Sequence, residues 1–376
     1  MTAGRHEPGG SAASAGSAGS SGPSRRRFLA GGAGVAAGAG LLLTRAGDAS
    51  AQGTGGQGTG GHVGGGHVGG GHGGGGHGGG INGATFRAGQ VVDHVANGFH
   101  PTQLLRSFDT GRVSALPDGR TLREWEVVAA DKDVEVAPGV SFPAWTFDGR
   151  IPGPTLRCRE GDRLRVRFVN GSAHPHTMHF HGIHPADMDG VPMIGRGVIG
   201  PGEEFVYEFD AEPFGLHLYH CHVGPLAEHI ARGMYGTFIV DPPSDRPPAD
   251  EMVMVQHGYN TTFDGAGNQL YAVNGIPFHY AVEPIKVRRG ELVRIYLVNV
   301  LEYDPVNSFH LHGNFFDYYP TGTRLQPAEY TDTVVQGQGQ RGICEVRFPH
   351  PGRYMFHAHK TEFAELGWMG FFEVSE

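Results

Sequence analysis

From about residue 81 onward, short apolar runs alternate with turns rich in Gly, Pro, Asn and Asp. The runs are rich in β-branched and aromatic residues, and no long segment repeats its apolar positions with the 3.6-residue period of a helix. This pattern predicts an all-β protein built from sandwich or barrel domains. We expect strands at residues 122–129, 163–168, 205–209, 236–240, 252–256 and 292–298.

A proline-rich segment at residues 241–248 divides this β-rich region into two halves that repeat each other. Corresponding blocks occur in the same order: PTLRCREGDRLRVRFVN at 154–170 and PIKVRRGELVRIYLVN at 284–299, HFHG at 179–182 and HLHG at 310–313, GLHLYHCH at 215–222 and GRYMFHAH at 352–359, GMYGTFIV at 233–240 and GWMGFFEV at 367–374. The repeat predicts a duplicated β-domain, with one copy at residues 81–243 and the other at 244–376.

The N-terminal part has a different character. Residues 24–29 read SRRRFL, a Gly- and Ala-rich apolar stretch follows, and Ala49, Ser50 and Ala51 resemble a cleavage site. Residues 1–51 therefore predict a twin-arginine-type export signal, and a periplasmic, cell-surface or secreted protein without a membrane span in the mature chain. Residues 52–80 are Gly-rich with a His at every fifth position from 62 to 77, which predicts a disordered linker.

Composition narrows the function. The formal net charge is −9, and a basic stripe is missing, which argues against nucleic acid as a partner. Three Cys in 376 residues are too few for a disulfide scaffold. We expect Cys158 and Cys344, on predicted strands, to be buried free thiols. The 23 His residues are abundant and partly ordered into motifs.

Each half contains two His-x-His pairs, and these are the main candidate metal ligands. On a strand, residues i and i+2 point to one face, so each pair presents two imidazoles side by side. Neutral imidazole suits Cu, Zn, Fe and Ni, so the pairs alone do not select a metal. The pairs are His179 and His181, His220 and His222, His310 and His312, and His357 and His359.

Cys221 indicates which metal the sequence predicts. It stands between His220 and His222, so its thiol points away from their rings, toward a second site on the opposite face. The expected partners are His229, Met234 and His176. Two His, one Cys and a weak axial Met are the ligands of a blue, electron-transfer copper.

These motifs, together with FDGRIPGPTLRCREGD and NGIPF…PIKVRRGE, resemble those of two-domain, laccase-like multicopper oxidases over roughly residues 120–376. The resemblance implies two tandem cupredoxin-like Greek-key domains and copper as the cofactor, four per chain. It implies a type 1 copper at His176, Cys221, His229 and Met234, a type 2 copper at His179 and His310, and a type 3 pair at His181, His220, His222, His312, His357 and His359.

The resemblance also implies an activity and an assembly. Electrons from a small-molecule or metal-ion donor would enter near His229, the ligand expected closest to the surface, and cross Cys221 to His220 and His222. Four transfers would reduce O2 to water. In the family the type 2 copper and the type 3 pair form a trinuclear cluster between a first-type and a second-type domain. In two-domain members these domains come from neighbouring chains, so we expect a homotrimer. Asp189 matches an acidic position near the cluster and is the predicted proton relay, with Glu362 as a second candidate.

The second half lacks its own blue site. Ala358 stands at the Cys position and Asn307 at the first His position, and the later His and axial positions fall on Phe363 and Trp368. We therefore expect a type 1 copper in the first domain only.

Two other function classes compete with the oxidase. A copper nitrite reductase shares the two-domain layout but has an H-x-x-D-x-H motif, where this chain has His176, His179 and His181, and lacks a His at the position of His222. A copper-storage or electron-carrier protein needs the blue site but not the four His pairs. The sequence favours the oxidase and leaves its donor open: phenols, aromatic amines and metal ions all remain.

Overall fold

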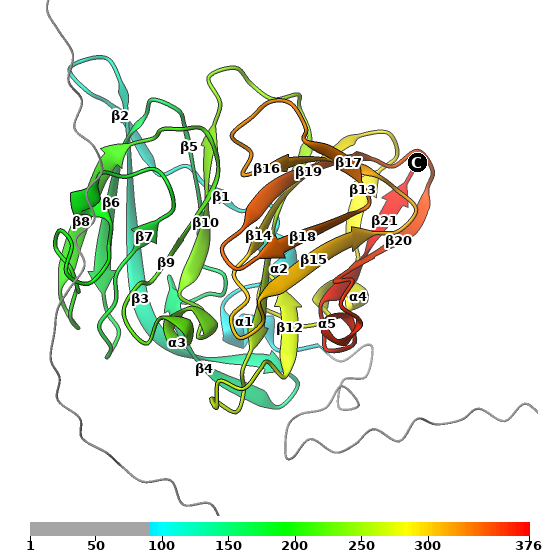
Figure 1. The fold of residues 1–376 in the computed structure, drawn as a ribbon, viewed down its shortest axis with the longest axis horizontal. Coiled ribbons are helices and arrows are strands. Elements are labelled where there is room, and N and C mark those ends of the chain that lie inside the picture. The colour runs from blue at the N-terminus through cyan, green and yellow to red at the C-terminus, as the bar shows by residue number, and fades with distance from the viewer. Residues whose placement is uncertain (1–90) are drawn as a thin grey trace, which may run out of the picture. The chain divides into compact units, whose positions relative to one another are not determined.

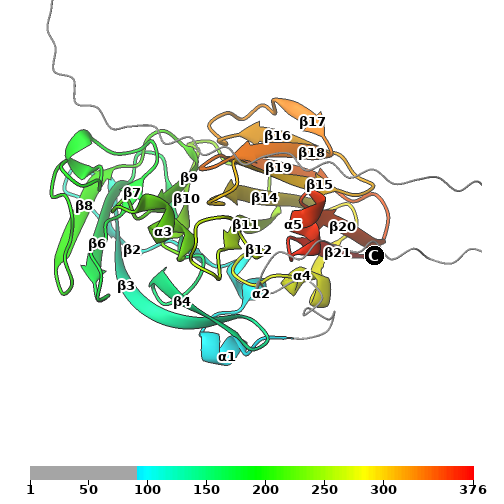
Figure 2. The same cartoon turned by 60° about the horizontal axis from the view of Figure 1, so that its bottom comes forward.

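A computed structural model describes residues 91–376, which form two β-sandwiches (Figures 1 and 2). The predicted export signal at 1–51 and linker at 52–80 lie outside the described residues. No helix among residues 91–376 is long and apolar enough to cross a membrane. The all-β prediction is confirmed, and each of the expected strands lies within an observed one.

The first sandwich consists of two sheets, with strand orders β1-β5-β10-β9-β7 and β2-β3-β6-β8, and β4 pairs with β3. Its strands are β1 (Phe108–Asp109), β2 (Arg112–Ala115), β3 (Thr121–Ala137), β4 (Val140–Phe147), β5 (Thr155–Arg159), β6 (Arg163–Asn170), β7 (His179–Phe180), β8 (Glu204–Asp210), β9 (Gly215–His220) and β10 (Tyr235–Asp241). A 3-10 turn, η2 (Ala186–Met188), and a helix, α3 (Leu226–Ala231), lie in its loops.

The second sandwich has strand orders β12-β11-β14-β19-β16-β17 and β13-β21-β20-β15-β18. Its strands are β11 (Asp250–Tyr259), β12 (Leu270–Val273), β13 (Ile285–Arg288), β14 (Leu292–Asn299), β15 (Val306–Leu311), β16 (Phe316–Pro320), β17 (Glu329–Thr331), β18 (Thr333–Gly337), β19 (Arg341–Arg347), β20 (Gly352–His357) and β21 (Met369–Ser375). Helices α4 (His279–Val282) and α5 (Thr361–Glu365) belong to this half, and α1 (His94–Asn97) and α2 (Pro101–Leu104) precede both sandwiches.

Strand pairing bears out the internal repeat. In the first half β3 pairs parallel with β6, and in the second β11 pairs parallel with β14. The parallel pair of β5 and β10 likewise corresponds to that of β13 and β21. His179 faces His220 across β7 and β9, and His310 faces His357 across β15 and β20. The duplicated sequence blocks therefore place the His pairs at matching positions in both domains.

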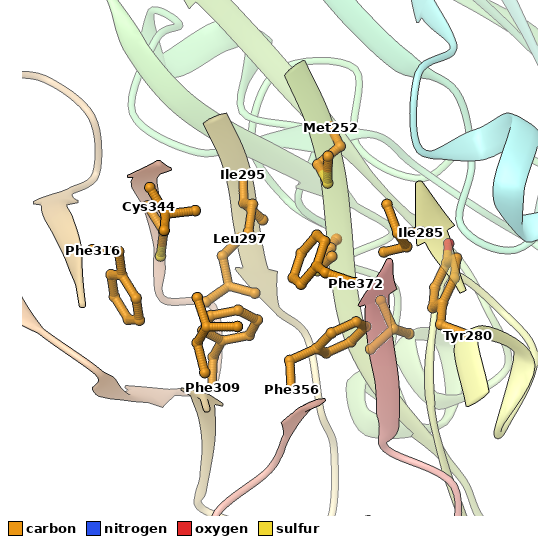
Figure 3. Packing of buried hydrophobic residues seen from close by; sticks show 14 of the residues in the cluster. Met252, Tyr280, Ile285, Ile295, Leu297, Phe309, Phe316, Cys344, Phe356 and Phe372 are labelled. Atoms are coloured by element: carbon orange, nitrogen blue, oxygen red, sulfur yellow. The ribbon is translucent and has the colours of Figure 1, made fainter. Parts of the chain in front are cut away.

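Burial along the strands explains how the halves pack. In β6, Leu164, Val166 and Phe168 point inward and alternate with outward Arg residues, as expected for a strand with one solvated face. In β14 both faces are buried. Ile295 and Leu297 lie in the core of the second sandwich, where Figure 3 shows Leu297 among Phe309, Phe356 and Phe372. The alternate residues of β14 pack in a separate apolar cluster shared with the first half, which holds the sandwiches together.

The segment before the first sandwich contacts both halves. We expected residues 81–243 to belong to the first domain, but Leu105 lies in the core of the second, and its carbonyl accepts a hydrogen bond of 2.9 Å from Val253 N. Tyr280 Oη donates to the Pro101 carbonyl. On the other side, Asn97 Nδ2 donates to the Glu135 carbonyl of β3. The segment therefore bridges the sandwiches.

Candidate metal centres

Cys221 and two His side chains converge in the first sandwich. Cys221 Sγ lies 3.6 Å from His176 Nδ1 and 3.2 Å from His229 Nδ1, and the two nitrogens are 3.2 Å apart. Donors bound to one first-row ion at about 2 Å each lie roughly 3–4 Å apart. The three side chains are buried, and their donor atoms are close enough together to bind a single ion between them.

The loop after β9 positions this group. Cys221 directly follows β9, and its N–H donates to the Met234 carbonyl at 3.0 Å. Met234 N–H donates in turn to the carbonyl of His229, which lies on α3. These bonds fold residues 221–234 back on themselves, and Met234 is fully buried in the same apolar cluster as Cys221.

A polar chain holds the His176 ring, and the sequence did not reveal it. His176 Nε2 is 3.0 Å from Ser172 Oγ, which hydrogen-bonds Asp131 Oδ1 at 2.7 Å. Such outer partners fix the orientation of a metal-binding imidazole and leave its other nitrogen free for the ion. Asp131 lies on β3, far from Ser172 in sequence, and no motif spacing connects them.

Burial prepares both imidazoles for metal binding. It lowers the pKa of His176 to about 3 and that of His229 to about 4, so both rings are neutral at pH 7. Burial also raises the pKa of the Cys221 thiol. A cation at the centre would oppose that effect, because metal binding releases the thiol proton.

Trp145 covers His229. His229 is only 3% exposed, but it is the most exposed of the four residues, as expected, because His176, Cys221 and Met234 are 0% exposed. The Trp145 and His229 ring centroids are 4.6 Å apart, and Arg232 lies over the same indole. A shallow pocket of about 650 Å³ opens beyond Trp145, with His174, Asp131, Asp133 and Glu228 in its lining.

Four His residues gather on the other side of the β9 terminus. His181 Nε2 lies 2.9 Å from His220 Nε2, and His179 is in ring contact with His181, His220 and His222. His220 Nδ1 is 2.8 Å from the Cys221 carbonyl, which can only accept, so the Nε2 atom of the neutral ring carries a lone pair. Burial and the neighbouring His220 lower the pKa of His181 to about 2.

The second sandwich repeats this arrangement. His312 Nε2 lies 3.0 Å from His357 Nε2, and His357 Nδ1 lies 2.7 Å from the Ala358 carbonyl. His310 is in ring contact with the other three His residues, His312, His357 and His359. Backbone anchors also match: His222 N–H donates to Thr177 Oγ1 at 3.0 Å, and His359 N–H donates to Ser308 Oγ at 2.8 Å.

We call these groups the first half-site (His179, His181, His220 and His222) and the second half-site (His310, His312, His357 and His359). Among residues 91–376, the ring contacts and hydrogen bonds between these His residues stay within one half-site. In each half-site three imidazoles bring their ligand atoms within 4.8 Å of one another, one fewer than the four ligands typical of imidazole-bound metals. Each half-site is therefore an incomplete ligand set.

Asp189 contacts the first half-site directly. Its carboxylate lies 2.9 Å from His179 Nδ1 and 3.4 Å from His184 Nε2, and its carbonyl also faces His179 Nδ1 at 2.8 Å. In the second half-site, His310 Nδ1 faces the Asp332 carbonyl at 3.0 Å and Thr333 Oγ1 at 2.7 Å, while the Asp332 carboxylate accepts from Thr333. Sequence reasoning found Asp189 but missed Asp332 and Thr333. Glu362 is exposed on α5 and pairs with Lys360.

Comparison with known proteins identifies the family. Residues 129–245 and 245–376 each match a family model described as multicopper oxidase. A solved structure described as a multicopper oxidase is 67% identical, with a TM-score of 0.74, over 76% of this chain and 100% of that chain. This chain belongs to the multicopper oxidase family. It is a two-domain member of a family of copper oxidoreductases, so copper is the metal that its donor groups imply.

This multicopper oxidase also resembles nitrite reductases. The copper-containing nitrite reductase of Neisseria meningitidis is 31% identical over 61% of this chain, which spans 63% of that relative's length. The solved copper nitrite reductase of Nitrosomonas europaea is 30% identical, with a TM-score of 0.62, over 68% of this chain and 94% of that chain.

Among residues 91–376, the second sandwich does not repeat the thiolate pocket of the first. Ala358 N–H donates to the Trp368 carbonyl at 3.2 Å and Trp368 N–H donates to the Phe363 carbonyl at 2.8 Å, which repeats the backbone bonds of Cys221, Met234 and His229. Phe363 and Trp368 therefore stand at the positions equivalent to His229 and Met234. Cys158 and Cys344 are buried free thiols, as expected.

Proposed function

We propose that this multicopper oxidase is a laccase-like enzyme that couples one-electron oxidation of a phenolic, aromatic or metal-ion donor to four-electron reduction of O2 to water. The observation that carries the proposal is the pairing of one Cys-containing group with two matching four-His half-sites. A single type 2 copper bound by three His would leave most of these imidazoles without a role.

The resemblance to two-domain multicopper oxidases supplies the assignment of ligands. His176, Cys221, His229 and Met234 would hold a type 1 copper, His179 and His310 a type 2 copper, and the remaining half-site residues a type 3 pair: His181, His220, His222, His312, His357 and His359. That makes four coppers per chain. When bound, the coppers supply the one-electron redox steps and the reduction of O2.

The chain itself connects and shields these sites. Cys221 is covalently continuous with His220 and His222, so one short stretch of backbone joins the thiolate group to the first half-site. We propose that the electron donor binds in the pocket beside Trp145, because Trp145 and this pocket lie between His229 and solvent. The Asp189 carboxylate, 2.9 Å from His179 Nδ1, would pass protons toward the half-site.

We further propose that the half-sites complete one another between chains, in a homotrimer. Each half-site offers two facing Nε2 atoms and a third imidazole, His222 or His359, which contacts His179 or His310 respectively. A first half-site meeting a second half-site of the next chain would give each type 3 copper three imidazoles. A head-to-tail contact of this kind closes into a ring. Residues 1–51 would export the chain by a twin-arginine-type route to the periplasm, cell surface or medium.

Donor-to-O2 stoichiometry tests the proposed activity. Copper-loaded protein should oxidise four equivalents of a one-electron phenolic donor per O2 consumed, without accumulating hydrogen peroxide. Two donor equivalents per O2, with peroxide as product, would overturn four-electron reduction. Copper analysis should give about four ions per chain above the amount bound by the His-rich segment, and the segment alone serves as the control for that amount.

Nitrite reduction is the second candidate, and the similarity to copper nitrite reductases favours it. The contact of His179 with three other His residues argues against it, because a nitrite reductase has its catalytic Asp in this motif. Anaerobic incubation with reduced donor and nitrite decides the matter. We expect the parent protein to form no more nitric oxide than the His179→Ala variant. Sustained nitric oxide formation by a parent protein with about two coppers per chain would show that it is a nitrite reductase.

A further inference from the structure

A second cluster of metal-binding side chains lies away from the oxidase sites. It combines His94 of α1 and His100, which precedes α2, with His279 and Glu283 at the two ends of α4. We propose that His100, His279 and Glu283, with His94 beside them, bind a divalent cation that prefers imidazole, either Zn²⁺ or Cu²⁺.

The geometry brings three ligand atoms within reach of one ion. One ligand atom each from His100, His279 and Glu283 lies within 4.8 Å of the others. The three imidazoles form a compact set, with ring centroids 4.2 Å apart for His94 and His100, and 5.1 Å apart from each of these to His279. Contraction by less than about 1 Å would bring the donors to the roughly 3–4 Å spacing of ligands on one ion.

The imidazoles have unused nitrogens. Both ring nitrogens of His94 and the Nδ1 atom of His100 are buried without a hydrogen-bond partner among residues 91–376. Buried polar atoms normally have a hydrogen-bond partner. These nitrogens have none among the described residues, and a bound metal cation would provide a partner for their lone pairs. His279 is already oriented, because its Nε2 atom lies 2.8 Å from Thr102 Oγ1. This outer contact resembles the supports that fix metal-binding imidazoles elsewhere in proteins.

The charge of the cluster suits a dication. Burial and the neighbouring His residues lower the pKa of His94 and of His279, the latter to about 3, so these rings are neutral ligands at pH 7. Glu283 is half exposed and lies 3.6 Å from His100 Nε2, longer than a hydrogen bond. The carboxylate is therefore free to turn toward an ion. Imidazole and carboxylate together select Zn²⁺ or Cu²⁺ over Mg²⁺ or Ca²⁺.

The position of the cluster suggests a structural role. His94 and His100 belong to the segment before the first sandwich, while α4 belongs to the second sandwich. A bound ion would fasten that segment to the second sandwich, in addition to the hydrogen bond from Tyr280 to Pro101.

Zinc binding to the full-length, copper-loaded protein tests the proposal. Equilibrium dialysis in a Zn²⁺–nitrilotriacetate buffer should find one more tightly bound Zn²⁺ per chain in the parent than in His279→Ala, with copper content equal in both. The matched control is His350→Ala, which removes an exposed His and should bind as much Zn²⁺ as the parent. Equal zinc content in the parent and His279→Ala would overturn the proposal.

The surface variant Glu283→Gln tests the same site even if His279→Ala misfolds. It should weaken zinc binding at this site by roughly 10-fold or more, because loss of a ligand should cost at least as much affinity as loss of an outer partner of a ligand. Saturating Zn²⁺ should raise the Tm of the parent by roughly 2–8 °C and that of Glu283→Gln by less. An equal rise in both proteins would show that zinc stabilises the chain elsewhere, and would overturn the site. Neither readout depends on oxidase activity, so the proposed function can fail independently.

Discussion

After the last His-x-His pair of each domain, the chain makes the same backbone turn but surrounds it with different side chains. Cys221 N–H bonds the Met234 carbonyl, and Ala358 N–H bonds the Trp368 carbonyl. Around the first turn stand His176, Cys221 and His229, whose donor atoms lie close enough together to hold a metal ion. Around the second stand Ala358, Phe363 and Trp368, all fully buried in an apolar core.

The supporting residues differ in the same way. Ser172 N–H donates to Asn170 Oδ1, and Leu301 N–H donates to Asn299 Oδ1, so the two residues are equivalent. Ser172 holds His176, whereas the fully buried Leu301 packs in the apolar core. The backbone therefore does not determine whether the pocket binds metal; a small number of side chains does.

The half-sites differ from the thiolate pocket, because a half-site is present in both domains. The facing Nε2 atoms are 2.9 Å apart in one and 3.0 Å in the other. In the proposed function, one thiolate pocket would be enough for electron entry, whereas an ion cluster shared by two half-sites would need both.

The largest effect is expected for Cys221→Ser. The variant should lose its intense visible absorption and all donor oxidation, because a hydroxyl does not replace a thiolate as a copper ligand. Absorption spectra and donor turnover measure this, with Cys344→Ser in the second domain as the matched control. Cys344→Ser should stay blue. A blue Cys221→Ser protein would contradict the type 1 assignment.

A smaller effect is expected for Asp189→Asn. Its carboxylate touches His179, so loss of the proton-carrying group should slow O2 consumption about 100-fold while the visible band remains. In Asp332→Asn the slowing should be smaller, because that carboxylate contacts Thr333 and only its carbonyl faces His310. Oxygen-electrode rates compare the two. Equal slowing of O2 consumption in both variants would contradict a special role of Asp189 in proton transfer. Loss of the visible band in Asp189→Asn would instead indicate a structural role for Asp189.

The smallest effect on activity is expected for Phe363→Ala. Its ring stacks on Tyr271 at 3.9 Å, so truncation should lower the free energy of unfolding by about 3–5 kcal/mol. The blue band and the rate of donor oxidation at 25 °C should stay unchanged. Denaturant unfolding measures the first and absorption the second. A weakened band would mean that the second pocket affects the first.

The sequence predicted the features that repeat with fixed spacing. Short runs of β-branched and aromatic residues between turns located the strands, and the duplicated blocks paired His179 with His310 and Cys221 with Ala358. Sequence could not predict contacts between residues brought together only by the fold. Asp131 reaches Ser172 across 41 positions, and Thr102 reaches His279 across 177. Trp145 covers His229 for the same reason, since β4 and α3 meet only in the folded chain.

Mixing two inactive variants tests most directly whether both half-sites build one O2-reducing site between chains. His179→Ala damages the first half-site and His310→Ala the second, so each protein alone should be blue but inactive toward O2. Co-expressed hetero-oligomers should recover about one quarter of the parent activity, because a quarter of random neighbour contacts join two intact half-sites. Blue hetero-oligomers that stay as inactive as either variant would contradict a site shared between chains.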